Sequence, residues 1–166
     1  MWAWILWTVV GLLVLGLGWF LAFVVTMRTK NPRGLAIIRG LNRRFANPGT
    51  LRSAGEHGSS TAVIRHVGRK SGKPYTTPID VYPKDDGYLV FLPYGSDADW
   101  VRNVRAAGSA EVGLDGRRHR VVAPRIVGPA EALPYVSAQN RRVARLFGIV
   151  DFLVLEHAPA VSGSSR

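Results

Sequence analysis

The sequence contains no cysteine among its 166 residues. This absence excludes disulfides, thiol catalysis, thiolate metal sites and iron–sulfur clusters. Residues 1–55 also lack any Asp or Glu, although they carry seven basic residues. Much of the net charge of +11 therefore lies in this first third of the chain, and the remainder is only mildly basic. Such an excess of positive charge favours an anionic partner or surface. The length suits one compact domain and is too short for two.

Charge is absent altogether from residues 2–27. As a helix this stretch is about 39 Å long, which exceeds the hydrocarbon core of about 30 Å. Its apolar residues surround the whole helix, and aromatic residues lie at both ends, as in interfacial belts. A cleaved signal peptide normally has a basic start, a shorter apolar stretch and a small-x-small site. Residues 1–27 are therefore predicted to be a retained transmembrane anchor.

Basic residues follow this apolar stretch directly, at Arg28, Lys30 and Arg33. The positive-inside rule then places the N-terminus outside the cell membrane and the domain in the cytoplasm. Residues 28–60 are predicted to be a basic juxtamembrane segment that ends in a Gly/Ser-rich connector. Within it, residues 35–45 have apolar residues at helical spacing. This helix either lies on anionic lipid, with contacts spread over residues 28–52, or packs on the domain behind it, and the two are compatible.

The pattern changes to alternating strands and turns over residues 61–159. Strands are predicted over residues 61–67, 75–82, 88–92, 110–114, 118–127 and 151–155, and helices over 97–107 and 129–147. Pro78 argues that its strand is an edge strand or contains a bulge. These elements predict an α+β domain in which about six mainly antiparallel strands form a sheet or barrel with peripheral helices. Residues 160–166 are expected to be a flexible tail.

The usual catalytic motifs are missing. The four histidines are widely spaced and have no ligand partner at i+4, so no metal site is expected. The sequence has no G-x-S-x-G elbow, P-loop or dinucleotide fingerprint. The basic residues lie beside the apolar stretch without interleaved aromatic residues, so nucleic-acid binding is not expected.

Two stretches remain as candidate binding sites. Residues 68–73, GRKSGK, form a basic glycine turn whose N–H groups and cations can hold a phosphate or a carboxylate. Residues 94–97, YGSD, lead into a helix that carries Trp100 and Asn103, and free N–H groups at a helix N-terminus can hold a polar ligand edge. Trp100 is equally consistent with packing between helix and sheet. Asn103 needs partners if it is buried, and it could clamp a neighbouring loop or a cofactor.

Three stretches together resemble the deazaflavin-dependent nitroreductases, which belong to the split-barrel flavin and deazaflavin oxidoreductases. They are GRKSGKPYTTPI (68–79), YGSDADWVRNVRAAG (94–108) and DFLVLEHAP (151–159). The resemblance implies a split β-barrel that binds coenzyme F420, which is favoured over FMN. It also implies three groups of cofactor-binding residues. These are the tail-binding turn (Arg69, Lys70, Ser71, Gly72), the strand along the deazaflavin (Thr76, Thr77, Pro78) and the cleft (Tyr94, Gly95, Ser96, Trp100, Asn103).

The sequence also departs from the best-known members of that family. Residues 96–99 are SDAD, where those members are rich in lysine and glycine, and acids near an anionic tail repel it. Residues 139–147 are QNRRVARLF, where those members place several tyrosines around the substrate. Nitroimidazole reduction is therefore not expected to carry over.

The resulting hypothesis is a membrane-anchored, cytoplasm-facing reductase. Hydride from reduced F420 would pass to a lipophilic, electron-poor acceptor such as a quinone or an enone, and the protein would provide orientation and exclusion of water. The proton would come from solvent or from one of three tyrosines, Tyr75, Tyr94 and Tyr135. The alternatives are a non-catalytic split barrel that binds flavin, deazaflavin, heme or lipid, and an anionic-lipid adaptor. The sequence leaves the oligomeric state open.

Overall fold

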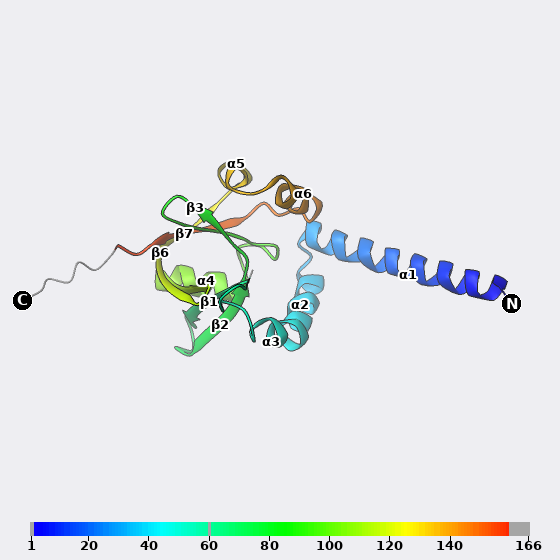
Figure 1. Cartoon of the computed structure of the whole chain (residues 1–166), viewed down its shortest axis with the longest axis horizontal. Helices are drawn as coiled ribbons and strands as arrows, with labels where there is room; N and C mark the ends of the chain where they lie inside the picture. Colours follow the sequence, from blue (N-terminus) through cyan, green and yellow to red (C-terminus); the bar gives the residue numbers. More distant parts are fainter. Residues whose placement is uncertain (1, 60, 160–166) are drawn as a thin grey trace, which may run out of the picture.

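A computed structural model describes residues 2–59 and 61–159, so the predicted tail at 160–166 lies outside the described residues. Helices occupy α1 Trp2–Thr29, α2 Pro32–Leu41, the π-helix η1 Asn42–Ala46, α3 Asn47–Thr50, α4 Asp99–Ala107, α5 Pro129–Ala132, the 3₁₀ helix η2 Leu133–Tyr135 and α6 Ala138–Leu146. Strands occupy β1 Ala62–Val67, β2 Pro74–Ile79, β3 Val81–Lys84, β4 Gly87–Phe91, β5 Ser109–Leu114, β6 Arg117–Val127 and β7 Phe152–His157. Figure 1 shows α1 projecting away from the sheet and its helices.

The strands form one curled antiparallel sheet in the order β2-β1-β5-β6-β7-β4-β3. The predicted strand at 75–82 is two strands, β2 and β3, which meet at Asp80. These two strands occupy opposite edges of the sheet although they adjoin in the chain, so their junction draws the edges toward each other. The described sheet consequently has seven strands instead of about six. Pro78 lies in β2, an edge strand, because a proline cannot donate to a second neighbour.

A bulge in β6 curves the sheet further. The strand pairs with β5 up to Val122, and its register against β7 shifts between Val122 and Arg125. Ala123 lies within this shift and has φ 51°, a left-handed conformation that bulges impose. β6 therefore pairs with β5 on one edge and with β7 on the other, and joins the two parts of the sheet. The curled sheet resembles half of a barrel.

The single helix predicted at 129–147 is wrong. Pro134 has no N–H, and Val136 is extended at φ −120° and ψ 152°, so the helical hydrogen bonds stop there. Ser137 starts a new helix, because its hydroxyl accepts a hydrogen bond from the Asn140 N–H at 3.2 Å. The region is therefore α5, η2 and α6 in succession.

Two hydrophobic clusters hold the sheet and its helices together. The first packs Val101 and Val104 of α4 against β1, β5 and β6, and the second packs Ala132 of α5 and Ala144 of α6 against β4 and β7. The helix at 97–107 was predicted to end at Gly108, and Gly108 indeed has φ 67° in the C-cap. Alternate residues of β4 and β7 belong to the two clusters, so α4 covers one face of the sheet and α5 and α6 cover the other.

α1 is long and apolar enough to span a membrane by its length and composition. Only 6% of its most apolar window is buried within the described structure, which distinguishes it from the core helix of a globular protein. Its last turns nevertheless contact the domain, since the rings of Phe23 and Phe147 meet edge to face at 5.7 Å. Just beyond the helix, Lys30 Nζ donates to the Pro93 carbonyl at 2.8 Å.

The juxtamembrane helices show one of the two alternatives that the sequence left open, packing on the domain, and contact with anionic lipid stays a prediction. Leu35 of α2 is buried, so one side of this segment packs on the rest of the chain. Ile37, Leu41 and Phe45 are exposed large apolar residues. The segment therefore packs on the domain and also presents an apolar face outward.

Candidate functional site

The basic glycine turn is fastened to α4 by the amide of Asn103. Asn103 Oδ1 accepts from the Arg69 main-chain N–H at 3.2 Å and from Arg69 Nη1 at 2.8 Å. Asn103 lies on the sheet-facing side of α4 between Val101 and Val104, and only 7% of its surface is exposed. Asn103 therefore clamps the turn, one of the two roles that the sequence allowed, and contact with a cofactor stays a prediction.

The NH₂ end of the same amide determines which tautomer of His66 fits the structure. Because both bonds from Arg69 are donated to Oδ1, the Asn103 NH₂ group faces His66 Nδ1, at 3.3 Å. His66 Nδ1 is therefore the acceptor, and the ring proton is assigned to Nε2, which donates to Thr77 Oγ1 at 3.3 Å. Burial lowers the pKa of His66. A neutral imidazole thus connects α4 to β2.

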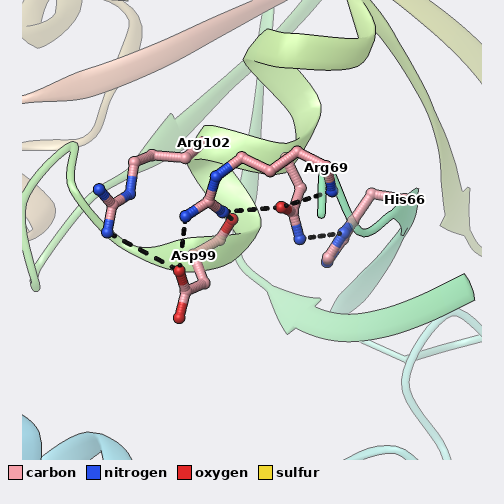
Figure 2. Close-up of polar contacts among 5 residues, drawn as sticks. His66, Arg69, Asp99 and Arg102 are labelled. Carbon is pink, nitrogen blue, oxygen red and sulfur yellow. Dashed lines mark hydrogen bonds and ion pairs between the residues drawn. The ribbon is translucent and has the colours of Figure 1, made fainter. Parts of the chain in front are cut away.

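An exposed carboxylate holds the Arg69 side chain. Arg69 Nη2 donates to Asp99 Oδ1 at 3.1 Å, and Arg69 Nη1 donates to the Asp99 carbonyl at 3.3 Å. Arg102 also approaches Asp99, at 3.8 Å (Figure 2). The acidic stretch at 96–99 therefore has a carboxylate that is already paired with two guanidinium groups. Arg69 in turn has much of its donor capacity occupied within the protein.

The rest of the turn is open and cationic. Lys70 and Lys73 are exposed, and among the described residues neither forms an ion pair. Ser71 Oγ lies 3.3 Å from the Tyr75 hydroxyl and accepts from the Lys73 N–H. Gly72 has φ 65°, which keeps the turn tight. Two unpaired ammonium groups on a rigid turn can bind a phosphate or a carboxylate.

Gly68 lets the turn close onto the neighbouring strand. A Cβ at this position would lie 2.5 Å from Ser71 Oγ and 2.7 Å from Tyr75 Cε2. The Tyr75 ring stacks with that of His66, with centroids 5.8 Å apart and an interplanar angle of 19°. The turn, Tyr75 and His66 are thus one packed unit.

The other predicted cofactor-binding residues lie around this unit and along the loop after β4. Thr76 is exposed, while Thr77 and Pro78 are half-buried on the edge strand β2. Trp100 packs against the hydrophobic cluster under α4, as the packing interpretation proposed. Gly95 has φ 80° in the loop before α4.

Three residues from other parts of the chain bind the loop at 93–96, so several of its polar groups already have a partner within the protein. The Ser96 N–H donates to Asp151 Oδ2 at 3.1 Å. The Tyr94 hydroxyl accepts from the Asn42 amide of η1, and burial raises the pKa of Tyr94. Lys30 Nζ binds the Pro93 carbonyl, and burial lowers the pKa of Lys30 although Asp151 opposes this.

The three candidate proton donors occupy different places. Tyr75 lies against the turn and His66, and Tyr94 faces η1. Tyr135 donates from η2 to the carboxylate of Asp85, in the hairpin between β3 and β4, at 3.1 Å. Tyr75 is therefore the tyrosine that the structure brings to the turn.

Sequence reasoning missed the site roles of His66 and Asp99. His66 was expected to be an isolated histidine, although Ala62, Ile64 and His66 alternate along β1 and all face the interior. That period-2 pattern was the available signal. The spacing of the histidines also hid the proximity of His119 and His157, whose ring centroids are 5.5 Å apart. No group of three or more potential metal ligands occurs among the described residues.

Comparison with known proteins gives a family match that covers the basic turn and the loop before α4. The model of a family described as F420H(2)-dependent quinone reductase matches residues 47–144, which is more than half of the chain. None of the curated proteins matches the chain.

Three solved structures illustrate the similarity at the level of coordinates. An F420-H2 dependent reductase (FDR-A) is 15% identical, with 58% of this chain and 94% of that chain covered and a TM-score of 0.44. General Stress Protein 26 from Bacillus anthracis str. Sterne is 11% identical, with 60% and 81% covered and a TM-score of 0.46. An F420 reductase is 11% identical, with 59% and 86% covered and a TM-score of 0.42.

Proposed function

The chain belongs to the F420H(2)-dependent quinone reductase family, and from this premise we propose that it is a membrane-anchored reductase of quinones or similar electron-poor acceptors. Membership confirms the predicted relationship to F420-dependent oxidoreductases, so the chain is an oxidoreductase and its cofactor is coenzyme F420. The match over residues 47–144 is the observation that carries the proposal, because it includes both the basic turn and the loop before α4.

The turn fits the anionic phospholactyl-oligoglutamate tail of F420. Its exposed ammonium groups, on Lys70 and Lys73, are unpaired within the described residues, whereas Arg69 is committed to Asp99 and Asn103. We therefore assign the tail contacts chiefly to the two lysines and to main-chain N–H groups of the turn. Arg69 and Asn103 act as positioning residues that hold the turn against α4.

When bound, reduced coenzyme F420 supplies the hydride. The chain itself contributes orientation through β2 and the loop at 94–96, and apolar packing through Trp100, which limits access of water. None of the three tyrosines is favoured as an internal source of a proton, because the turn beside the Tyr75 hydroxyl is assigned to the tail of the cofactor and not to its reacting ring. A proton drawn from solvent is the alternative source.

α1 provides the membrane anchor in this proposal. Its length and composition suit a span, and its last turns contribute contacts to the domain through Phe23, Arg28 and Met27, which is 3% exposed. A segment destined for cleavage would not be expected to supply such packing. The basic residues after α1 support a domain on the cytoplasmic side, and a quinone and the anchored enzyme would be confined to the same bilayer.

The test uses the full chain in phospholipid nanodiscs. F420 binding is measured by fluorescence for the wild type, for Lys70→Glu and for the control Arg118→Glu, which reverses an exposed charge at the start of β6. Reversing one charge near the anionic tail changes the energy by about 2 kcal/mol in water, so Lys70→Glu should weaken binding about 30-fold. Oxidation of F420H₂ is then followed with a naphthoquinone and with an enone.

Two results would contradict the proposal. If Lys70→Glu and Arg118→Glu weaken F420 binding equally, the turn does not bind the tail of the cofactor. Tight binding of F420 without oxidation of F420H₂ by any acceptor would favour the non-catalytic binder that the sequence left open.

A further inference from the structure

The outer face of α6 combines exposed apolar and basic side chains. Val143, Leu146 and, just beyond the helix, Val150 are 38%, 45% and 55% exposed. Arg142 and Arg145 are exposed beside them, and α6 contains no Asp or Glu. We call these five residues the α6 face. Val143 and Leu146 are three residues apart, as are Arg142 and Arg145, so each pair lies on one side of the helix.

This face lies next to the end of α1. Arg28 Nη1 donates to the carbonyls of Arg145 at 2.9 Å and of Leu146 at 3.3 Å, which are the last carbonyls of α6. The Phe23 and Phe147 rings meet at 5.7 Å. Figure 1 shows the end of α1 meeting the domain between α6 on one side and α2 on the other. The position of α6 relative to a membrane is therefore set by the position of α1.

The length of α1 gives the depth of this junction. Its 28 residues rise about 42 Å, and a hydrocarbon core takes up about 30 Å. The excess of about 12 Å corresponds to roughly eight residues at 1.5 Å per residue. Since Phe23 and Met27 in the last turns of α1 pack on the domain, we assign this excess to its C-terminal turns. Phe23 and Arg28 then lie at the level of the lipid headgroups.

We propose that the α6 face is a second membrane-contact surface, which rests on the anionic headgroup region of the bilayer that α1 spans. This rests on the membrane anchoring proposed above. Val143, Leu146 and Val150 enter the boundary between headgroups and acyl chains, and Arg142 and Arg145 bind lipid phosphates. With α2 on the opposite side of α1, this second contact fixes the tilt of the domain on the membrane.

The absence of native cysteine allows a direct test with single-cysteine variants of the full chain. Leu146→Cys and Val150→Cys carry an environment-sensitive fluorophore in proteoliposomes with and without anionic lipid, and doxyl-labelled lipids act as quenchers. Val67→Cys is the matched control, because Val67 is an exposed valine at the end of β1. Leu13→Cys in α1 reports the anchor itself.

Quenching at positions 146 and 150 at least twofold stronger than at position 67, with Leu13→Cys also quenched, supports the proposal. Arg142→Glu should then reduce quenching at position 146 about twofold in anionic vesicles, and Arg118→Glu should leave it unchanged. Quenching at position 13 with none above the control at 146 and 150 overturns the α6 contact but keeps the anchor. Labels at 146 and 150 that are shielded from water but not quenched by lipid would indicate a second copy of the chain and also overturn it. If the label at position 13 is not quenched, both the anchor and the α6 contact are overturned.

Discussion

Replacing Asn103 by alanine should destabilise the domain far more than its position on a surface helix suggests. The change removes the partner of the Arg69 main-chain N–H, which is part-buried, and of His66 Nδ1, which is buried. A buried polar group left without a partner costs about 1–3 kcal/mol. The Arg69 guanidinium keeps its bonds to Asp99, so we count the other two groups only. Loss of the partner of His66 Nδ1 costs about 1–3 kcal/mol and that of the part-buried Arg69 N–H about 1 kcal/mol, so the expected loss of unfolding free energy is about 2–4 kcal/mol.

The measurement is urea unfolding of the full chain in a mild detergent, followed by circular dichroism of the sheet. Arg102→Ala is the control on the same helix, because its side chain is 49% exposed and its 3.8 Å pair with Asp99 contributes less than about 0.5 kcal/mol. F420 affinity should fall together with stability in Asn103→Ala, since the turn loses its attachment to α4. An Asn103→Ala variant that is no less stable than Arg102→Ala would refute the clamp, and with it the assignment of Arg69 as a positioning residue.

Three further predictions concern the same turn and the junction with α1. Burial holds the pKa of His66 below that of the unfolded chain, so its contribution to stability should be complete above about pH 6.5 and lost as the pH falls through the lower folded pKa. This pH dependence of the unfolding midpoint should disappear in His66→Gln, and an unchanged profile would contradict it. Gly68→Ala places a methyl group against Ser71 and Tyr75, so it should weaken F420 binding at least fivefold in a titration while hydrogen exchange in β5 and β6 stays normal. Gly34→Ala should push α2 away from α1, because its new Cβ would collide with a side chain of α1. Proteolysis within α2 should therefore be faster than in the control Gly40→Ala, where the new Cβ meets no other atom.

The sequence was sufficient for the elements whose signals are local. Periodicity and turn residues located six strand regions, the helix ending at Gly108 and the apolar helix at the N-terminus. The bend at Asp80 was not predictable in this way, because it depends on which strands the two halves of the segment pair with. The break at 134–137 could have been predicted, since Pro134 cannot donate within a helix and Ser137 is a preferred N-cap residue.

The candidate site was only partly accessible to the same reasoning. The turn at 68–73 stood out by its basic and glycine residues. Asn103 stood out because a buried amide needs hydrogen-bond partners. Their contact with each other depends on how α4 lies over β1, which no spacing in the sequence reveals. Asp99 illustrates the difficulty, because its charge suggested repulsion of an anionic tail. In the fold its carboxylate is paired with Arg69 and Arg102, so its negative charge is largely compensated.

The segment that follows α1 is in direct contact with the candidate cofactor site through the loop at 93–96. Lys30 and Asn42, both from the juxtamembrane segment, bind Pro93 and Tyr94 of this loop, and Asp151 holds Ser96. The loop leads directly into α4, whose Asn103 fastens the basic turn. A rotation of the domain about the end of α1 would therefore strain the loop before it changed the sheet. For this reason the proposed membrane contacts would bear on the geometry of the site as well as on location, and removing residues 1–46 should loosen the loop at 93–96 as well as remove the proposed anchor.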